Sequence, residues 1–138
     1  MWHYAKLFLT LIPFMLLLDY IWIARLMQGF YISQLGSYAR VRGAVIEPVY
    51  WAALLVYLAL PLGILLFVLP RVNPDNMFWS ALGWGAMFGL VVYVVYDMTN
   101  MATLESWPIK MTIVDIGWGC FLCGISTVFA AYADKWLK

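Results

Sequence analysis

The sequence predicts an all-α fold, an integral membrane bundle of four transmembrane helices. Of its 138 residues, 66% are hydrophobic and only 11% are charged, whereas about a quarter of the residues in a soluble domain are charged. Eight Trp and nine Tyr residues are also typical of membrane proteins, because amphipathic rings gather at the two membrane interfaces. Four apolar segments, finally, reach the length of about 20 residues that a helix needs to cross about 30 Å of hydrocarbon.

The first predicted span covers roughly residues 4–26. Lys6 and the apolar run after it are compatible with a signal peptide, but the chain continues DYIWIARLMQ without a small-residue cleavage site, so we expect a retained span. The second span covers about residues 48–69. A tight turn, RVNPDN, separates it from the third, at about 76–100, and the fourth covers about 111–132.

All four segments must be helices, because open sheets would leave unpaired amide groups in lipid. We therefore expect one domain over residues 1–138, with both termini on one side of the membrane, and an interfacial helix in the FYISQLGSY stretch of the first connection. Positive charges do not select the side, which leaves insertion in both orientations open, although we favour cytoplasmic termini. The terminal side carries Lys6, Arg71, Lys135 and Lys138, and the other side carries Arg25, Arg40, Arg42 and Lys110.

Three aspartates lie inside the predicted spans, where each ionisable group costs about 2.5–3.5 kcal/mol on insertion scales. Asp19 comes late in the first span, Asp97 late in the third and Asp115 early in the fourth. Antiparallel threading brings all three to the same leaflet, and Glu47 at the start of the second span lies on that side too. Intramembrane acids usually face the bundle interior or a wet cavity, so we expect an acidic, polar pocket near one leaflet.

Neighbouring residues extend this predicted pocket. Asp19 and Trp22 are three residues apart and share a helix face, as do Asp115 and Trp118. The repeated Asp-x-x-Trp spacing on two antiparallel helices hints at pseudo-symmetry. The other candidate ligand-binding residues are Thr99, Asn100 and Thr103, with Arg25, Glu47 and Lys110 as supporting charges.

A structural interpretation of the three acids stays open, because buried polar residues also hold membrane helices together. Asp75 and Asp134, in a loop and at the tail, are expected to be solvated, as is His3. Small residues at four-residue spacing, Ala81, Gly85 and Gly89, predict either close packing inside the bundle or a homodimer interface on the third span.

Several classes of function are disfavoured by composition. A net charge of +1 carries no footprint of nucleic-acid binding. Two Cys and one His are too few for a structural metal site, and we expect no cofactor. The spacing of Cys120 and Cys123 is that of a redox pair, but among apolar residues at mid-membrane these are expected to be packing residues.

The stretches LDYIW, YDMTNMATLESWP and VDIGWG resemble a family of small bacterial membrane proteins, domain-of-unknown-function family 2177. The resemblance covers nearly the whole chain. It implies a four-span protein of the bacterial inner membrane and a link to lipid-modifying enzymes, and it assigns no catalytic residue. The family motif maps onto Asp19, Trp22, Asp97, Thr99, Asn100, Thr103, Trp107, Pro108, Asp115 and Trp118.

We favour a protein that binds or transports a small polar or amphiphilic ligand, which predicts an elongated cavity. The alternative is a membrane-embedded enzyme that modifies lipid, with Asp97 and Asp115 about 3–6 Å apart in a closed pocket as acid and base. A non-catalytic partner of such an enzyme is also open. In that case each acid should be paired with Arg25, Lys110 or the backbone, with no void beside it.

Overall fold

The structure is a computed structural model that describes residues 2–137. Within this part of the chain, four helical stretches are long and apolar enough to span a membrane, which confirms the predicted all-α bundle. Their bounds are Trp2–Leu26, Tyr50–Arg71, Pro74–Thr103 and Ile109–Leu137.

The third and fourth spans are longer than predicted. Helix α4 (Met77–Thr103) continues past Asn100, and α5 (Ile109–Leu137) continues past Tyr132. Polar residues stay helical at these ends, and α4 stops only where Leu104 adopts an extended backbone. Hydropathy marks the apolar part of a span, whereas the hydrogen-bonded helix runs on beyond it.

The first two spans change helix type along their length. Helix α1 (Trp2–Asp19) continues into the π-helical segment η1 (Tyr20–Leu26). Helix α3 (Tyr50–Gly63) contains Pro61 and continues into the π-helical segment η3 (Ile64–Val68). Proline lacks the amide proton that the helix ladder needs, so the change of helical winding at Ile64, three residues after Pro61, has a local cause.

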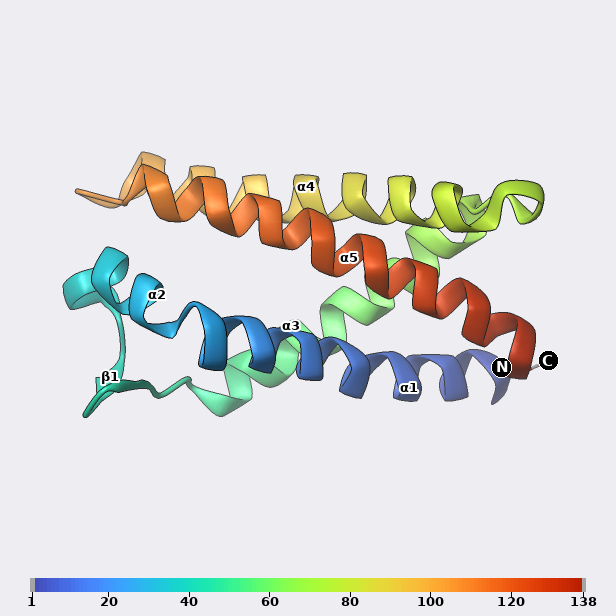
Figure 1. The fold of residues 1–138 in the computed structure, drawn as a ribbon, viewed down its shortest axis with the longest axis horizontal. Coiled ribbons are helices and arrows are strands. Elements are labelled where there is room, and N and C mark those ends of the chain that lie inside the picture. Colours follow the sequence, from blue (N-terminus) through green and yellow to red (C-terminus); the bar gives the residue numbers. More distant parts are fainter. Residues whose placement is uncertain (1, 138) are drawn as a thin grey trace.

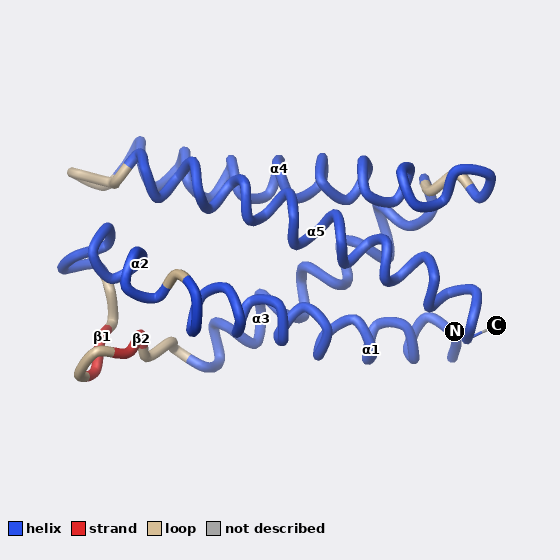
Figure 2. The backbone as a smooth tube through the Cα atoms, in the orientation of Figure 1, coloured by secondary structure: helices blue, strands red, loops and turns tan. Residues whose placement is uncertain are grey.

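The connection between these spans contains more structure than predicted. Helix α2 (Gln28–Leu35) occupies part of the stretch expected to be an interfacial helix. A short antiparallel hairpin follows, β1 (Val41–Arg42) and β2 (Val45–Ile46), whose turn uses Gly43 at φ 66° (Figure 2). The remaining short 3₁₀ segments are η2 (Gly36–Tyr38), η4 (Leu69–Arg71) and η5 (Pro74–Asn76).

Helices α4 and α5 form a long antiparallel pair, and α5 then crosses onto α1 near the two chain ends (Figure 1). Helix α3 runs diagonally behind them. Helix α3 contacts α1, whereas η3, beyond Pro61, contacts α4 and α5. Four spans therefore enclose a tight half at the terminal end and a looser half at the end that carries α2 and the hairpin.

One buried stripe of α1 changes character along the helix. Leu7, Leu11 and Met15 are fully buried, and Asp19 follows at the same four-residue spacing with 6% exposure. The apolar part of this stripe packs in the terminal half against residues of η3 and α5, and Phe14 stacks on Phe129 with ring centroids 4.2 Å apart. The stripe reaches its acid in the looser half.

Small residues allow α4 and α5 to lie in close contact. A Cβ added at Gly89 would lie 2.1 Å from the Gly119 carbonyl oxygen, and one at Gly85 would lie 2.5 Å from that of Cys123. Ala81 on the same stripe is fully buried. The stripe Ala81, Gly85 and Gly89 is thus already covered within one chain, and the expected homodimer stays a prediction. Cys123 is fully buried with a free thiol, which fits a packing residue.

His3 and Asp134 were expected to be solvated, and this is wrong. His3 Nε2 lies 2.7 Å from Asp134 Oδ1, and the two side chains are only 23% and 19% exposed. The contact joins the first turn of α1 to the last turns of α5, because the two helices are antiparallel and α5 crosses onto α1 at this end (Figure 1).

Candidate functional site

Asp19 and Asp115 come from antiparallel helices and meet at the end of the bundle that carries α2. Asp19 is the last residue of α1, and Asp115 lies early in α5. Both line one cavity of about 490 Å³, here called the inner cavity. It is lined by residues of all four spans, among them Ile23, Ala53, Tyr57, Leu60, Val92, Tyr93, Tyr96 and Trp118.

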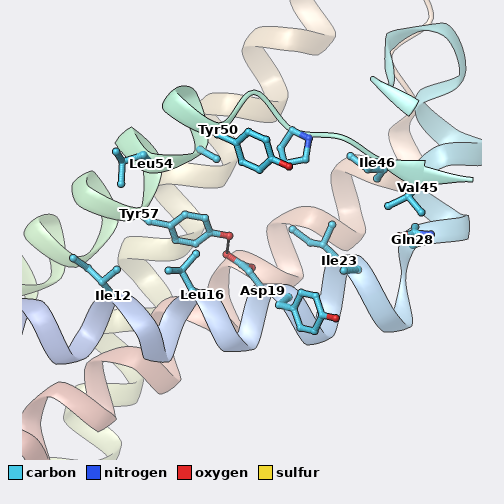
Figure 3. A pocket seen from close by; sticks show the side chains of 14 residues that line it. Ile12, Leu16, Asp19, Ile23, Gln28, Val45, Ile46, Tyr50, Leu54 and Tyr57 are labelled. Carbon is cyan, nitrogen blue, oxygen red and sulfur yellow. Dashed lines mark hydrogen bonds between the residues drawn. The ribbon is translucent and has the colours of Figure 1, made fainter. Parts of the chain in front are cut away.

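The carboxylate of Asp19 is held by two neutral donors. Trp118 Nε1 donates to Oδ1 at 2.7 Å. The Tyr57 hydroxyl donates to Oδ2 at 2.9 Å, and Figure 3 shows this second contact. Tyr57 lies at the middle of α3, and the buried residues of this helix, Leu60, Pro61 and Gly63, all lie closer to its C-terminal end. This hydrogen bond therefore helps to fix α3 against α1 in the looser half.

The carboxylate of Asp115 is held from outside the spans. The Tyr31 hydroxyl on α2 donates to Asp115 Oδ1 at 2.7 Å and accepts from Trp22 Nε1 at 3.2 Å. Burial, and after it the nearby charge of Asp115, raise the pKa of Tyr31 well above its ordinary value. Tyr31 therefore remains a donor at neutral pH and links α2 to the cavity wall.

The repeated Asp-x-x-Trp spacing forms a crossed pair. The rings of Trp22 and Trp118 are stacked with centroids 4.5 Å apart and planes 1° from parallel. The indole of Trp118 donates to the aspartate of the other helix, Asp19, and the indole of Trp22 reaches Asp115 through the Tyr31 hydroxyl. The pseudo-symmetry hinted at by spacing thus has a geometric counterpart between α1 and α5.

A second opening, of about 660 Å³, lies between α1, α3 and the hairpin, and is here called the lateral groove (Figure 3). Apolar side chains such as Ile12, Leu16 and Leu54 form its walls. Asp19 and Tyr57 line both the groove and the inner cavity. The hydrogen bond between these two residues therefore stands at the junction of the two spaces.

Asp97 is buried as expected, but it lines neither of these spaces. It lies next to Trp107 and Thr112, at the corner between α4 and α5. These two neighbours hydrogen-bond to each other, Trp107 Nε1 to Thr112 Oγ1 at 3.1 Å. Within residues 2–137, neither carboxyl oxygen of Asp97 has a hydrogen bond of normal geometry.

The other residues expected near Asp97 also belong to this corner. The Thr103 hydroxyl donates to the Thr99 carbonyl at 2.8 Å, and the amide of Leu104 donates to the Asn100 carbonyl at 2.8 Å. Thr99, Asn100 and Thr103 line neither the inner cavity nor the lateral groove. Their contacts complete the end of α4, so the YDMTN stretch forms a helix corner rather than a wall of the cavity.

The three expected supporting charges lie away from the acids. Arg25 and Lys110 are exposed, and Arg25 lies over the Tyr20 ring, 6.0 Å from its centroid. Glu47 pairs instead with Arg42 at 3.5 Å on the exposed hairpin side. Asp19 and Asp115 are thus hydrogen-bonded to Tyr and Trp rather than paired with Arg25 or Lys110, and a cavity lies beside them.

Sequence reasoning missed the tyrosines of the site, which are Tyr31, Tyr57, Tyr93 and Tyr96. A usable signal was present, because Tyr57 and Tyr93 lie well inside spans rather than at their ends. A buried tyrosine hydroxyl needs a hydrogen-bond partner, and the intramembrane aspartates are the natural acceptors.

Within residues 2–137, no group of three or more His, Cys, Asp or Glu could hold a metal ion. Residues 4–132 match the model of a family described as "Predicted membrane protein (DUF2177)". The matched range includes both aspartates of the cavity, Asp97 and all four tyrosines. No curated protein and no solved structure matches the chain.

Proposed function

The chain belongs to the DUF2177 family of predicted membrane proteins, and we propose that it binds an amphiphile taken laterally from the bilayer. The polar head would lie in the inner cavity and the apolar part would extend through the lateral groove. The observation that carries the proposal is that Asp19 and Tyr57 line both spaces. A cavity of about 490 Å³ with mainly apolar walls has the size and lining of sites that hold small ligands.

The walls of the groove support access from the lipid. Leu16 and Leu54 are 41% and 57% exposed. Both lie in helices long and apolar enough to span a membrane, so lipid chains rather than water are expected to contact them. An acyl chain beside them would replace bilayer lipid at little cost, whereas a water-soluble ligand would gain nothing from these side chains. The polar groups are concentrated at the inner end, where a head group would be desolvated.

The packing of the terminal half supports binding rather than passage across the membrane. Leu11, Ile64 and Leu122 are fully buried in a continuous core below the cavity. A transported solute would have to separate these side chains, and cores packed to crystal-like density do not open without a large rearrangement. Binding requires no such step.

A cavity-filling variant tests the proposal. Ala53 lines both spaces, so Ala53→Trp should block the binding of a hexadecyl amphiphile while the fold is kept. Native mass spectrometry of the full chain released from uncharged maltoside micelles counts the bound molecules. The matched control is Leu55→Trp on the same helix, which is 57% exposed and lines neither space.

The proposal would be contradicted if the Ala53→Trp variant bound as much of the amphiphile as the Leu55→Trp variant. Equal thermal unfolding curves of the two variants, followed by circular dichroism, would show that reduced binding is not a loss of fold.

The proposal includes a location, the bacterial inner membrane, with one domain and cytoplasmic termini. The described chain ends lie together at one end of the bundle (Figure 1), which supports termini on the same side. Fusion of green fluorescent protein or alkaline phosphatase to the C-terminus tests the side. A fluorescent, phosphatase-negative fusion is expected, and activity of both reporters would instead indicate insertion in both orientations.

A further inference from the structure

The inner cavity contains two carboxylates without a cationic partner. Within residues 2–137, no Lys, Arg or His lines the inner cavity or the lateral groove. The ion pairs of this part of the chain are His3 with Asp134 and Arg42 with Glu47, and both lie elsewhere. Two acids that face one apolar space are costly unless a ligand or a proton compensates their charge.

Aromatic rings surround the same space. Tyr57, Tyr93, Tyr96 and Trp118 line the inner cavity together with the two acids. Trp118 is only 8% exposed and its ring is fixed, because it stacks on Trp22 and donates to Asp19. Aromatic rings that line a space can attract a cation with their negative faces, and since one face of Trp118 is covered by Trp22, the tyrosine rings are the candidates for this contact.

Both features favour a positively charged head group, and we propose that the bound amphiphile carries an ammonium group. This inference rests on the proposed function and specifies its ligand. The ammonium would lie between Asp19 and Asp115, with the rings of Tyr93 and Tyr96 against its methylene or methyl groups. Groups of this kind are recognised by aromatic cages in which cation–π attraction supplements a carboxylate.

Other ligand chemistries fit less well. A bare metal ion would require several oxygen or nitrogen ligands at short range, and residues 2–137 contain no such cluster. An anionic head group would meet two carboxylates and no basic side chain. An uncharged head group could accept the space but would leave the charge of the acids uncompensated.

Four probes at equal concentration test the inference on the full chain in uncharged maltoside micelles, with native mass spectrometry as the readout. Three share a hexadecyl chain: hexadecyltrimethylammonium, hexadecanol and hexadecanoate. The fourth is tetramethylammonium, which has the charge but no chain. We expect hexadecyltrimethylammonium to bind at least about tenfold more tightly than either other hexadecyl probe.

Variants locate the preference. The double variant Asp19→Asn with Asp115→Asn keeps side-chain oxygens that accept hydrogen bonds from Tyr and Trp, and it should lose the preference while it still binds hexadecanol. Glu105→Gln is the matched control, because this exposed acid lies at the same end of the bundle and lines neither space. It should keep the preference.

The outcomes separate the two proposals. Equal binding of the three hexadecyl probes would overturn the ammonium inference and leave amphiphile binding intact. Failure of all four probes would overturn both. Binding of tetramethylammonium as tight as that of the long-chain cation would support the ammonium site and overturn the lipid source, because a free organic cation would then suffice.

Discussion

The terminal half of the bundle and the half that carries Asp19 and Asp115 are formed by the same four spans, yet different interactions hold their interiors together. On α1 a single buried stripe passes through both, as Leu7, Leu11 and Met15 and then as Asp19. In the terminal half, α1, η3 and α5 interdigitate around fully buried side chains. In the other half, hydrogen bonds from Tyr57 and Trp118 replace that packing, and a cavity remains. The difference indicates that packing fixes the fold at one end and polar contacts fix it at the other.

The largest effect is expected where two backbones touch. Gly89→Leu would bring a side chain into the Gly119 carbonyl, which already lies 2.1 Å from the position of a Cβ. Because the obstacle is backbone, α4 and α5 must separate, and we expect a loss above the usual overpacking range of about 1–3 kcal/mol. Unfolding in mixed micelles, followed by circular dichroism, measures it.

The control for this variant is Gly83→Leu on the same helix, since nothing lies within 4 Å of a Cβ there. It should unfold close to the wild type. Leu has a higher helix propensity than Gly, so propensity alone would stabilise both variants, and equal losses would mean that the contact with α5 does not explain the effect at Gly89.

The next effect compares the two halves on one helix. Leu11→Ala leaves a void in the packed half and should lower the free energy of unfolding by about 2 kcal/mol. In a membrane the unfolded helices stay in lipid, so little transfer energy is lost, but the lost packing around the void still destabilises the fold. Leu16→Ala, at a side chain that is 41% exposed in the lateral groove, should cost less than about 0.5 kcal/mol. Similar losses at both positions would contradict the division into a packed and a hollow half.

The bundle could be predicted from the sequence because hydropathy and length decide which segments cross a membrane. The depth of Asp19 and Asp115 also followed from antiparallel threading. Asp97 was placed in the same layer by the same reasoning and is buried, but depth does not determine which neighbour a side chain faces. Its partners depend on the corner formed by Trp107 and Thr112, which no helical periodicity encodes.

The hairpin and the role of Tyr31 could not be predicted for a related reason. Strands as short as β1 and β2 carry too few residues for an alternating pattern, and Tyr31 reaches Asp115 across many residues of intervening chain. The Asp-x-x-Trp repeat, in contrast, is visible in the sequence. Which aspartate each tryptophan contacts depends on the packing of α1 against α5, and the spacing alone does not determine it.

A smaller effect tests the link between α2 and the hollow half. Tyr31→Phe removes the hydrogen bonds to Asp115 and Trp22 and should cost about 1–2 kcal/mol at neutral pH. Burial raises the pKa of Tyr31 in the folded chain, so its proton stabilises the fold below about pH 10, the ordinary tyrosine pKa, and that contribution is lost as the pH rises further.

The wild type should therefore lose stability more steeply above about pH 10 than Tyr31→Phe does. Unfolding curves of both proteins between neutral and alkaline pH measure the difference. Parallel pH profiles of the two proteins would show that Tyr31 is not buried in the folded chain, and would contradict the placement of α2 against the site.

The smallest effect is expected at Asp97, although its side chain has no exposed surface. An amide has the shape of a carboxyl group, and Asp97 makes no normal hydrogen bond within residues 2–137 that Asn would lose. Asp97→Asn should therefore change the free energy of unfolding by less than about 0.5 kcal/mol and leave amphiphile binding unchanged. Asp115→Asn, which alters the cavity wall, should weaken the binding of a cationic amphiphile. If Asp97→Asn weakens that binding as much, the corner and the cavity form one site, and the three acids act together after all.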